Sequence, residues 1–163
     1  MTLDSSALIA VLFSEPGYLS LVDRMLEAGT LRIGTPTLVE TSLVFQSRRG
    51  PSVRQPRRAR KTAGDSAPQH YDEVYELVKE LGVTVVPFGE SEWHRAVDAF
   101  ARYGRGRHKA SLNFGDCLAY ATAASVGDTL LYVGDDFTHT DLPAGPQLRK
   151  GARHRKEPRG LRG

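Results

Sequence analysis

An acidic residue in the first turn of a strongly predicted helix is the most distinctive chemical feature of this sequence. Asn113 is a good helix N-cap, and Asp116 falls three residues later, where a carboxylate can bond back to the cap amide. Apolar residues then recur at helical spacing as far as Val126, which places Asp116 at the positive end of a packed helix. A capping box alone accounts for Asp116, but four other acidic residues occupy comparable positions.

Those four residues also stand where strands end or helices begin. Asp4 follows the first expected strand, Glu40 lies in the second turn of an expected helix, and Asp135 and Asp136 follow the last expected strand. Carboxylates that meet about 4 Å apart repel by on the order of 4 kcal/mol per pair at an effective dielectric near 20, so convergence requires a divalent cation. Because no His or Cys set accompanies them, these hard oxygen donors favour Mg²⁺, with Mn²⁺ as a substitute.

The elements that must position these acids alternate as in a parallel α/β fold. Short apolar segments at 1–4, 31–34, 83–87 and 129–133 read as strands, and one or two helical patterns separate each from the next. Parallel neighbours need such crossover connections. The sequence therefore predicts an α/β fold with a parallel sheet of about four to five strands, sandwiched by helices, whose strands end at one shared edge.

Helical spacing also predicts which side chains face the core. Ser91 is expected to cap one helix, and the strand at 83–87 has the composition of a strand covered on both faces. The helical stripes place the following large apolar side chains inward: Val39, Leu43, Trp93, Val97 and Phe100.

Charge is strongly segregated along the chain. Residues 48–62 hold seven basic residues and no acidic one, and residues 144–163 hold seven basic residues and one acidic residue. Removing these from totals of 22 basic and 19 acidic residues leaves 8 and 18, a formal charge of about −10. An acidic body suits metal ions, and basic appendages suit a polyanion.

A basic turn leads directly into the helix that carries Asp116. Its cations are candidates for contact with phosphate groups: Arg105, Arg107, His108 and Lys109. A solvated loop is the alternative for this turn. His139, after the last strand, reads as a surface or capping histidine more readily than as a group that assists chemistry.

Cysteine content and hydropathy indicate the compartment. The single cysteine, Cys117, excludes an intrachain disulfide and reads as small buried filler, which fits a reducing compartment. The apolar run 7–13 is too short to span a membrane and lacks the charged start of a signal peptide. The expectation is a cytoplasmic protein without a membrane segment.

Four segments, in this order, resemble the PIN-domain ribonucleases, and most closely the VapC-like toxins of bacterial type II toxin–antitoxin modules. The third is highly specific; the segments are LDSSA at 3–7, TLVETSLV at 37–44, RYGRGRHKASLNFGDCLAYA at 102–121 and LLYVGDDFTHTDL at 130–142. The resemblance implies a PIN-like nuclease domain over 1–142. The chain departs from the family pattern in two places, a basic, flexible insertion expected at 48–70 and a basic, disordered tail expected at 143–163.

The resemblance also implies roles for the acids. Asp4 and Asp116 match the principal magnesium ligands, and Glu40 matches the helix glutamate. The fourth acid falls at Asp135 or Asp136, and Asp136 is preferred because it belongs to the Asp-Phe pair that family members share.

Two supporting positions match as well. Ser6 corresponds to the small hydroxyl residue beside the first aspartate, and Asn113 to the polar residue before the third acid. The implied activity is a magnesium-dependent endoribonuclease that cleaves RNA phosphodiesters with metal-activated water. The implied partners are RNA, a cognate VapB-like antitoxin and a second copy of the chain in a homodimer.

Two other function classes remain open on the residues alone. A phosphatase or phosphotransferase could use Asp4 as a nucleophile on a similar sheet, although the second aspartate that dehalogenase-like phosphatases carry two residues later is absent. A catalytically silent module that binds RNA or the antitoxin is the other alternative.

Overall fold

Five short parallel strands form one sheet in the computed structural model, which describes residues 1–49, 70–143 and 147–148. Their order is β3–β2–β1–β4–β5. The strands are β1 (Thr2–Leu3), β2 (Arg32–Gly34), β3 (Thr84–Val86), β4 (Leu130–Val133) and β5 (Gln147–Leu148). The predicted parallel α/β sheet is confirmed.

The fifth strand lies in the segment that the sequence predicts to be a disordered tail. Gln147 pairs with Tyr132 and Leu148 pairs with Val133, so these two residues continue the sheet beyond β4. The remainder of the predicted insertion and tail, residues 50–69, 144–146 and 149–163, lies outside the described residues.

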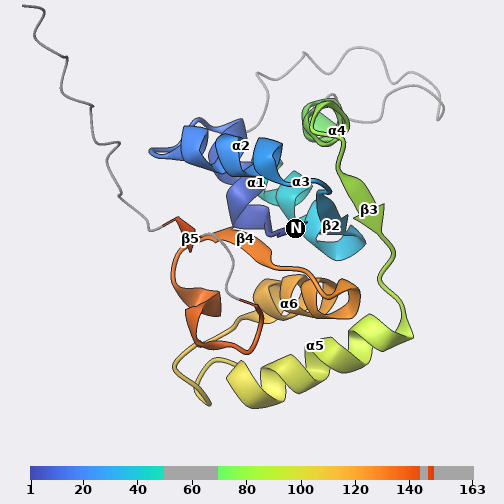
Figure 1. Ribbon diagram of the computed structural model, residues 1–163, viewed down its shortest axis with the longest axis vertical. Coiled ribbons are helices and arrows are strands. Elements are labelled where there is room, and N and C mark those ends of the chain that lie inside the picture. The colour runs from blue at the N-terminus through green and yellow to red at the C-terminus, as the bar shows by residue number, and fades with distance from the viewer. Residues whose placement is uncertain (50–69, 144–146, 149–163) are drawn as a thin grey trace, which may run out of the picture.

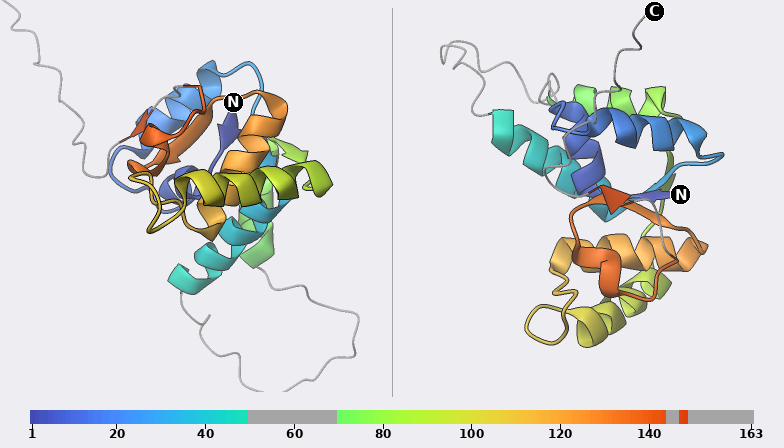
Figure 2. Two further views of the ribbon diagram at one scale, coloured as in Figure 1. Left: turned by 90° about the horizontal axis from the view of Figure 1, so that it is seen from below. Right: turned by 60° about the vertical axis from the view of Figure 1, so that its left-hand side comes forward.

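Helices cover both faces of the sheet (Figures 1 and 2). The helices α1, α2 and α4 pack on one face, and α6 packs on the other with α5 outside it. Their bounds are α1 (Ser5–Leu12), α2 (Tyr18–Glu27), α3 (Thr35–Arg49), α4 (His70–Glu80), α5 (Glu90–Tyr103), α6 (Phe114–Val126) and the 3₁₀-helix η1 (Asp136–His139).

The core follows from alternation along the strands. In β4, Leu131 packs with the cluster of α1 and α2, whereas Leu130 and Tyr132 pack with the cluster of α5 and α6. Neighbouring side chains of a strand point to opposite faces, so a fully buried central strand must be apolar on both sides. This arrangement fixes α6 on the sheet face opposite α1.

Three sequence predictions about burial and capping are wrong. The strand β3 is the edge of the sheet, and Val85 is 40% exposed instead of being covered on both faces. Helix α5 begins at Glu90 rather than after Ser91, because the Glu92 carboxylate accepts a hydrogen bond from the Gly89 amide at 2.9 Å.

The third wrong prediction concerns the apolar stripes of α3 and α5. Only Ala96, Ala99 and Tyr103 of α5 are buried. Five large apolar side chains predicted to face inward are exposed by 42–60%, namely Val39, Leu43, Trp93, Val97 and Phe100. An apolar stripe records that a face can be buried, but not that this chain supplies the surface that buries it.

Among the described residues, the helices are all too short or too polar to cross a lipid bilayer.

Candidate active site

The first acid, Asp4, is held at the carboxyl end of β1. It is the N-cap of α1 and accepts a hydrogen bond from the Ser6 amide on Oδ2 at 3.0 Å. The Ser6 hydroxyl donates to the same oxygen at 2.5 Å and accepts a bond from the Val133 amide at 3.0 Å. Ser6 therefore links the Asp4 carboxylate, which is 5% exposed, to the end of β4.

Asp116 forms the predicted capping box at the start of α6. The Asn113 amide donates to Asp116 Oδ2 at 2.7 Å, and the Asp116 amide donates to Asn113 Oδ1 at 3.1 Å. The bond to Asp116 Oδ2 fixes the direction of the carboxylate from within its own helix turn. The capping interpretation of Asp116 is thus confirmed, and it is compatible with a second role for the other carboxylate oxygen of Asp116, Oδ1.

Glu40 reaches the same region from α3, which follows β2 without a break. Its carboxylate lies against the backbone of Gly115, the residue before Asp116. Asp135 and Asp136 arrive from the end of β4, at the start of η1, and both are exposed. The acids of three strand exits and one helix start therefore share one edge of the sheet.

The buried acids influence one another electrostatically. Burial raises the pKa of Asp116 to about 6, and the charges of Asp4 and Asp136 add to this rise. Burial also raises the pKa of Asp4, with a further contribution from the Glu40 charge. Burial raises the pKa of Glu40 as well, and the Asp116 charge adds to it. Asp4, Glu40, Asp116 and Asp136 are linked in this way.

The donor types of the acidic set suit a hard divalent cation. Every candidate ligand is a carboxylate, the donor type that Mg²⁺ and Mn²⁺ prefer. Within residues 1–49, 70–143 and 147–148, however, no three His, Cys, Asp or Glu side chains stand close enough together to hold an ion as they are placed. The residues fit a hard divalent cation in their chemistry, and they are not assembled into a finished coordination sphere.

In the basic turn between α5 and α6, Arg105 acts on the acidic site, whereas Arg107 and His108 lie against aromatic rings of α5. Arg105 is exposed, and its charge opposes the rise in the pKa of Asp116. Arg107 lies over the ring of Phe100 at 5.3 Å, and His108 meets the ring of Tyr103 edge-on at 5.3 Å.

The other residues of the turn and its surroundings agree with simple roles. Lys109 is exposed. His139 is exposed at the end of η1, as expected for a surface residue. Cys117 is buried, and burial raises the pKa of its thiol to about 11, so it is the predicted inert filler.

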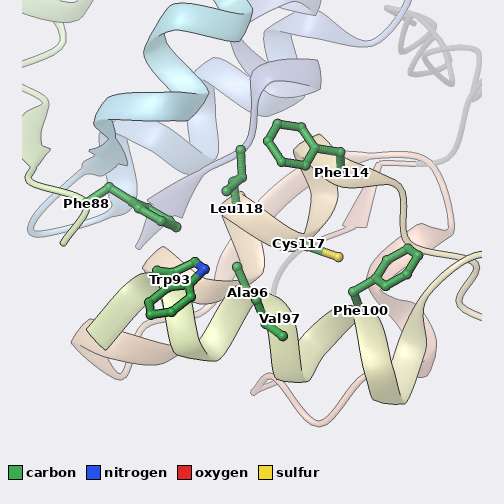
Figure 3. A pocket seen from close by; sticks show the side chains of 8 residues that line it. All are labelled: Phe88, Trp93, Ala96, Val97, Phe100, Phe114, Cys117 and Leu118. Atoms are coloured by element: carbon green, nitrogen blue, oxygen red, sulfur yellow. The ribbon is translucent and has the colours of Figure 1, made fainter. Parts of the chain in front are cut away.

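Sequence reasoning missed three features around the acids. A side-chain hydrogen bond from Ser5 lowers the pKa of Glu40, and the Glu40 carboxylate occupies the space that a side chain on Gly115 would need. The third feature is an apolar hollow between α5 and α6 (Figure 3). Phe114 borders this hollow and is 79% exposed. Of these three features, only the contact of Glu40 with Gly115 has a signal in the sequence, namely a glycine in the first turn of a helix.

Comparisons with known proteins agree with this geometry. The family model described as PIN domain matches residues 1–142. Ribonuclease VapC36 of Mycobacterium tuberculosis is 35% identical over 144 residues, which are 87% of this chain and 91% of that protein.

Two solved structures share the fold. The crystal structure of Mycobacterium tuberculosis VapC20, a Sarcin-Ricin loop cleaving toxin, has a TM-score of 0.61 at 13% identity and covers 87% of this chain and 95% of its own. A toxin-antitoxin complex from Klebsiella pneumoniae has a TM-score of 0.57 at 15% identity, covering 86% and 92%.

Proposed function

This chain belongs to the PIN-domain family and, within it, to the VapC ribonucleases, and we propose that it is a magnesium-dependent endoribonuclease that acts as the toxin of a toxin–antitoxin module. The observation that supports this most is the linked set of four carboxylates, Asp4, Glu40, Asp116 and Asp136, at one edge of a parallel sheet.

In this proposal Asp4 and Asp116 are the principal ligands of Mg²⁺, and Glu40 and Asp136 complete the acidic set. A bound divalent cation lowers the pKa of a water molecule and polarises a phosphate oxygen. Glu40 or Asp136 orients the attacking water and accepts its proton. Because its pKa is raised, the Glu40 carboxylate is a stronger base than an ordinary glutamate.

The supporting residues hold these groups in place. Ser6 fixes Asp4 through its hydroxyl, and the Asn113 amide fixes Asp116. Arg105 offers a cation for the phosphate backbone of RNA beside the acids, with Arg107, His108 and Lys109 along the same turn.

Cleavage of RNA by the purified protein tests the proposal. We expect cleavage with Mg²⁺ or Mn²⁺, none with EDTA, and none by Asp116→Asn, which keeps a capping oxygen and should remain folded. Asp23→Asn, an exposed acid of α2, is the matched control and should cleave normally. Near-normal cleavage by Asp116→Asn would refute the ligand role, and release of phosphate from a small phosphomonoester would favour a phosphatase.

Metal binding can be measured without RNA. An ion that binds only the folded protein adds about 2.7 kcal/mol to its stability at a hundredfold excess over Kd. Magnesium should therefore raise the melting temperature of the wild type and raise that of Asp4→Asn less. A wild-type melting temperature that ignores millimolar Mg²⁺ and Mn²⁺ argues against the metal site.

The partners of the proposal are a VapB-like antitoxin and a second copy of the chain. We assign the second copy to the apolar face formed by exposed side chains of three helices, namely Val39, Leu43, Trp93, Val97, Phe100 and Phe114. Two apolar hollows meet on this face, because Phe88, Phe114 and Leu118 line both of them. Figure 3 shows the hollow between α5 and α6. A group of exposed large apolar side chains marks an interaction surface, and in a two-fold dimer the same surface of each copy meets the other.

A charge on the apolar face tests the dimer. Val97→Lys should reduce the mass measured by light scattering from dimer to monomer. Leu26→Lys is the matched control, because Leu26 is 73% exposed on α2, away from the apolar face. If Val97→Lys remains dimeric, the apolar face is not the dimer interface, and the antitoxin becomes its expected occupant.

A further inference from the structure

Gly115 is the point at which α6 comes closest to the carboxylate of Glu40. A Cβ atom built on Gly115 would lie 2.5 Å from Oε1, 2.8 Å from Oε2 and 2.9 Å from Cδ of Glu40. All three atoms of the carboxylate are therefore nearer than any real Cβ contact permits. Gly115 itself is buried and is the second residue of α6, between Phe114 and Asp116.

The backbone does not require a glycine at this position. Gly115 is not among the residues with positive φ, so its backbone suits any L-amino acid. Glycine is also the weakest helix former after proline, so alanine would be preferred here on local grounds. The remaining reason for glycine is the space that the Glu40 carboxylate occupies.

We infer that Gly115 is a positioning residue: its missing side chain lets the Glu40 carboxylate rest on the first turn of α6, one residue from Asp116. This inference rests on the proposed function, in which Glu40 belongs to the metal-binding acids. The carboxylate also lies near the positive end of the helix, which favours a negative charge there.

A methyl group at this position would move the carboxylate and not the fold. The atoms in its way are the far end of a flexible side chain, whereas the backbone of α3 is not among the three nearest atoms. Restoring ordinary contact requires Glu40 to withdraw by about 1 Å. A misplacement of about 1 Å in an active site can lower a rate on the order of 10²-fold.

The first measurement is the affinity of the RNA-free protein for Mn²⁺, by calorimetry. Gly115→Ala should melt within a few degrees of the wild type and bind Mn²⁺ between about 10- and 100-fold more weakly, the usual loss when a residue that supports a metal ligand is changed. RNA cleavage should fall with it. The control is Gly29→Ala, where an added Cβ meets nothing within 4 Å, and it should match the wild type.

A second background separates the clash with Glu40 from any other effect. In Glu40→Ala the clashing atoms are absent, so adding Gly115→Ala should change neither the melting temperature nor the affinity for Mn²⁺. If Gly115→Ala alone fails to fold, Glu40→Ala should restore folding. A further loss in the Glu40→Ala background, or failure to restore folding, overturns the inference.

The single variants distinguish this inference from the proposed function. If Glu40→Ala keeps wild-type affinity for Mn²⁺ and wild-type cleavage, the role of Glu40 in the proposed function is wrong. If Glu40→Ala is impaired while Gly115→Ala behaves as the wild type, only the inference about Gly115 is wrong.

Discussion

Two groups of carboxylates in this protein have opposite effects on stability. Asp128 and Asp141 are surrounded by donors, and although burial alone would raise their pKa, bonds from Arg32 to Asp128 and from Tyr120 and Arg102 to Asp141 lower it. Asp4, Glu40 and Asp116 have a raised pKa because burial and like charges outweigh their donors. When ionised, Asp128 and Asp141 stabilise the folded protein, whereas Asp4, Glu40 and Asp116 destabilise it.

The pH dependence of stability should reveal this cost at Asp116. Its pKa rises from 3.8 to about 6 on folding, so the folded state holds more protons than the unfolded state between these values, and stability falls as pH rises through them. Above pH 6 the full cost, on the order of 3 kcal/mol without metal, is present. Asp116→Asn should therefore melt above the wild type at pH 7 in EDTA and equal to it near pH 4.

The control for this prediction is Asp23→Asn, which removes an exposed carboxylate of α2 outside the acidic site. A difference between Asp116→Asn and the wild type that stays constant from pH 4 to pH 7 would contradict the prediction. It would mean that the substitution acts through packing or capping and not through the charge.

Residue-level predictions succeeded where the interaction is local. The Asn113–Asp116 capping box depends on residues three apart, and the sequence alone defined both partners. The contact between Glu40 and Gly115 depends on how closely α3 approaches α6, which no local pattern records. The choice between Asp135 and Asp136 likewise depends on where η1 places each side chain relative to Asp116.

At the scale of elements, the position of α6 depends on a second close approach. Gly34, in β2, faces Thr122 of α6, and a Cβ on Gly34 would clash with the Thr122 hydroxyl. Thr122 is fully buried, and its hydroxyl donates to the Leu118 carbonyl at 3.0 Å. Two glycines in different elements thus allow α6 to lie against both the sheet and α3.

Gly34→Ala should destabilise the protein by about 1–3 kcal/mol, the usual cost of overpacking a tight interior. Unlike the methyl at Gly115, this one meets a side chain fixed on a buried helix, so α6 or β2 must move. The free energy of unfolding in urea measures the effect. Adding Thr122→Ala should recover part of the loss, because the clashing hydroxyl is removed.

Additivity decides this prediction, with Gly29→Ala again as the unstrained control. If Gly34→Ala and Thr122→Ala lower stability by amounts that simply add, the two residues do not interact, and the close approach of β2 to α6 does not set the position of the helix.

Element-level predictions failed where the sequence lacks information about partners. Alternation and helical spacing identified the parallel sheet, because the central strands and their helices bury each other. The same spacing gave α5 a wide apolar stripe, of which α6 covers only Ala96, Ala99 and Tyr103. Trp93, Val97 and Phe100 remain exposed, since periodicity cannot distinguish an internal partner from an external one.

At the scale of the whole molecule, charge is divided between the acidic site and the basic segments. Outside residues 48–62 and 144–163, the chain carries a formal charge of about −10. Such a body repels RNA before any phosphate meets the acids. Arg105 offsets part of this field beside Asp116. Most of the basic excess belongs to residues 50–69 and 149–163, which lie outside the described residues. We propose that these basic residues attract the RNA backbone electrostatically, without contacts to specific bases.

Truncation after Leu148 tests the tail and keeps β5, whose pairing with β4 supports the segment before Asp136. In the Asp116→Asn background, which we expect to be inactive, truncation should lower RNA affinity most at low salt. Single-stranded binding has a log-log salt slope of about −0.7 per phosphate contacted, so losing about three contacts flattens the slope by roughly 2. A full-length chain with the seven basic residues of 149–162 changed to Gln should match the truncation, because charge and not length causes the effect. Equal salt slopes for all three chains would show that the tail does not contact RNA. Residues 48–62 would then be the remaining basic segment to test for this role.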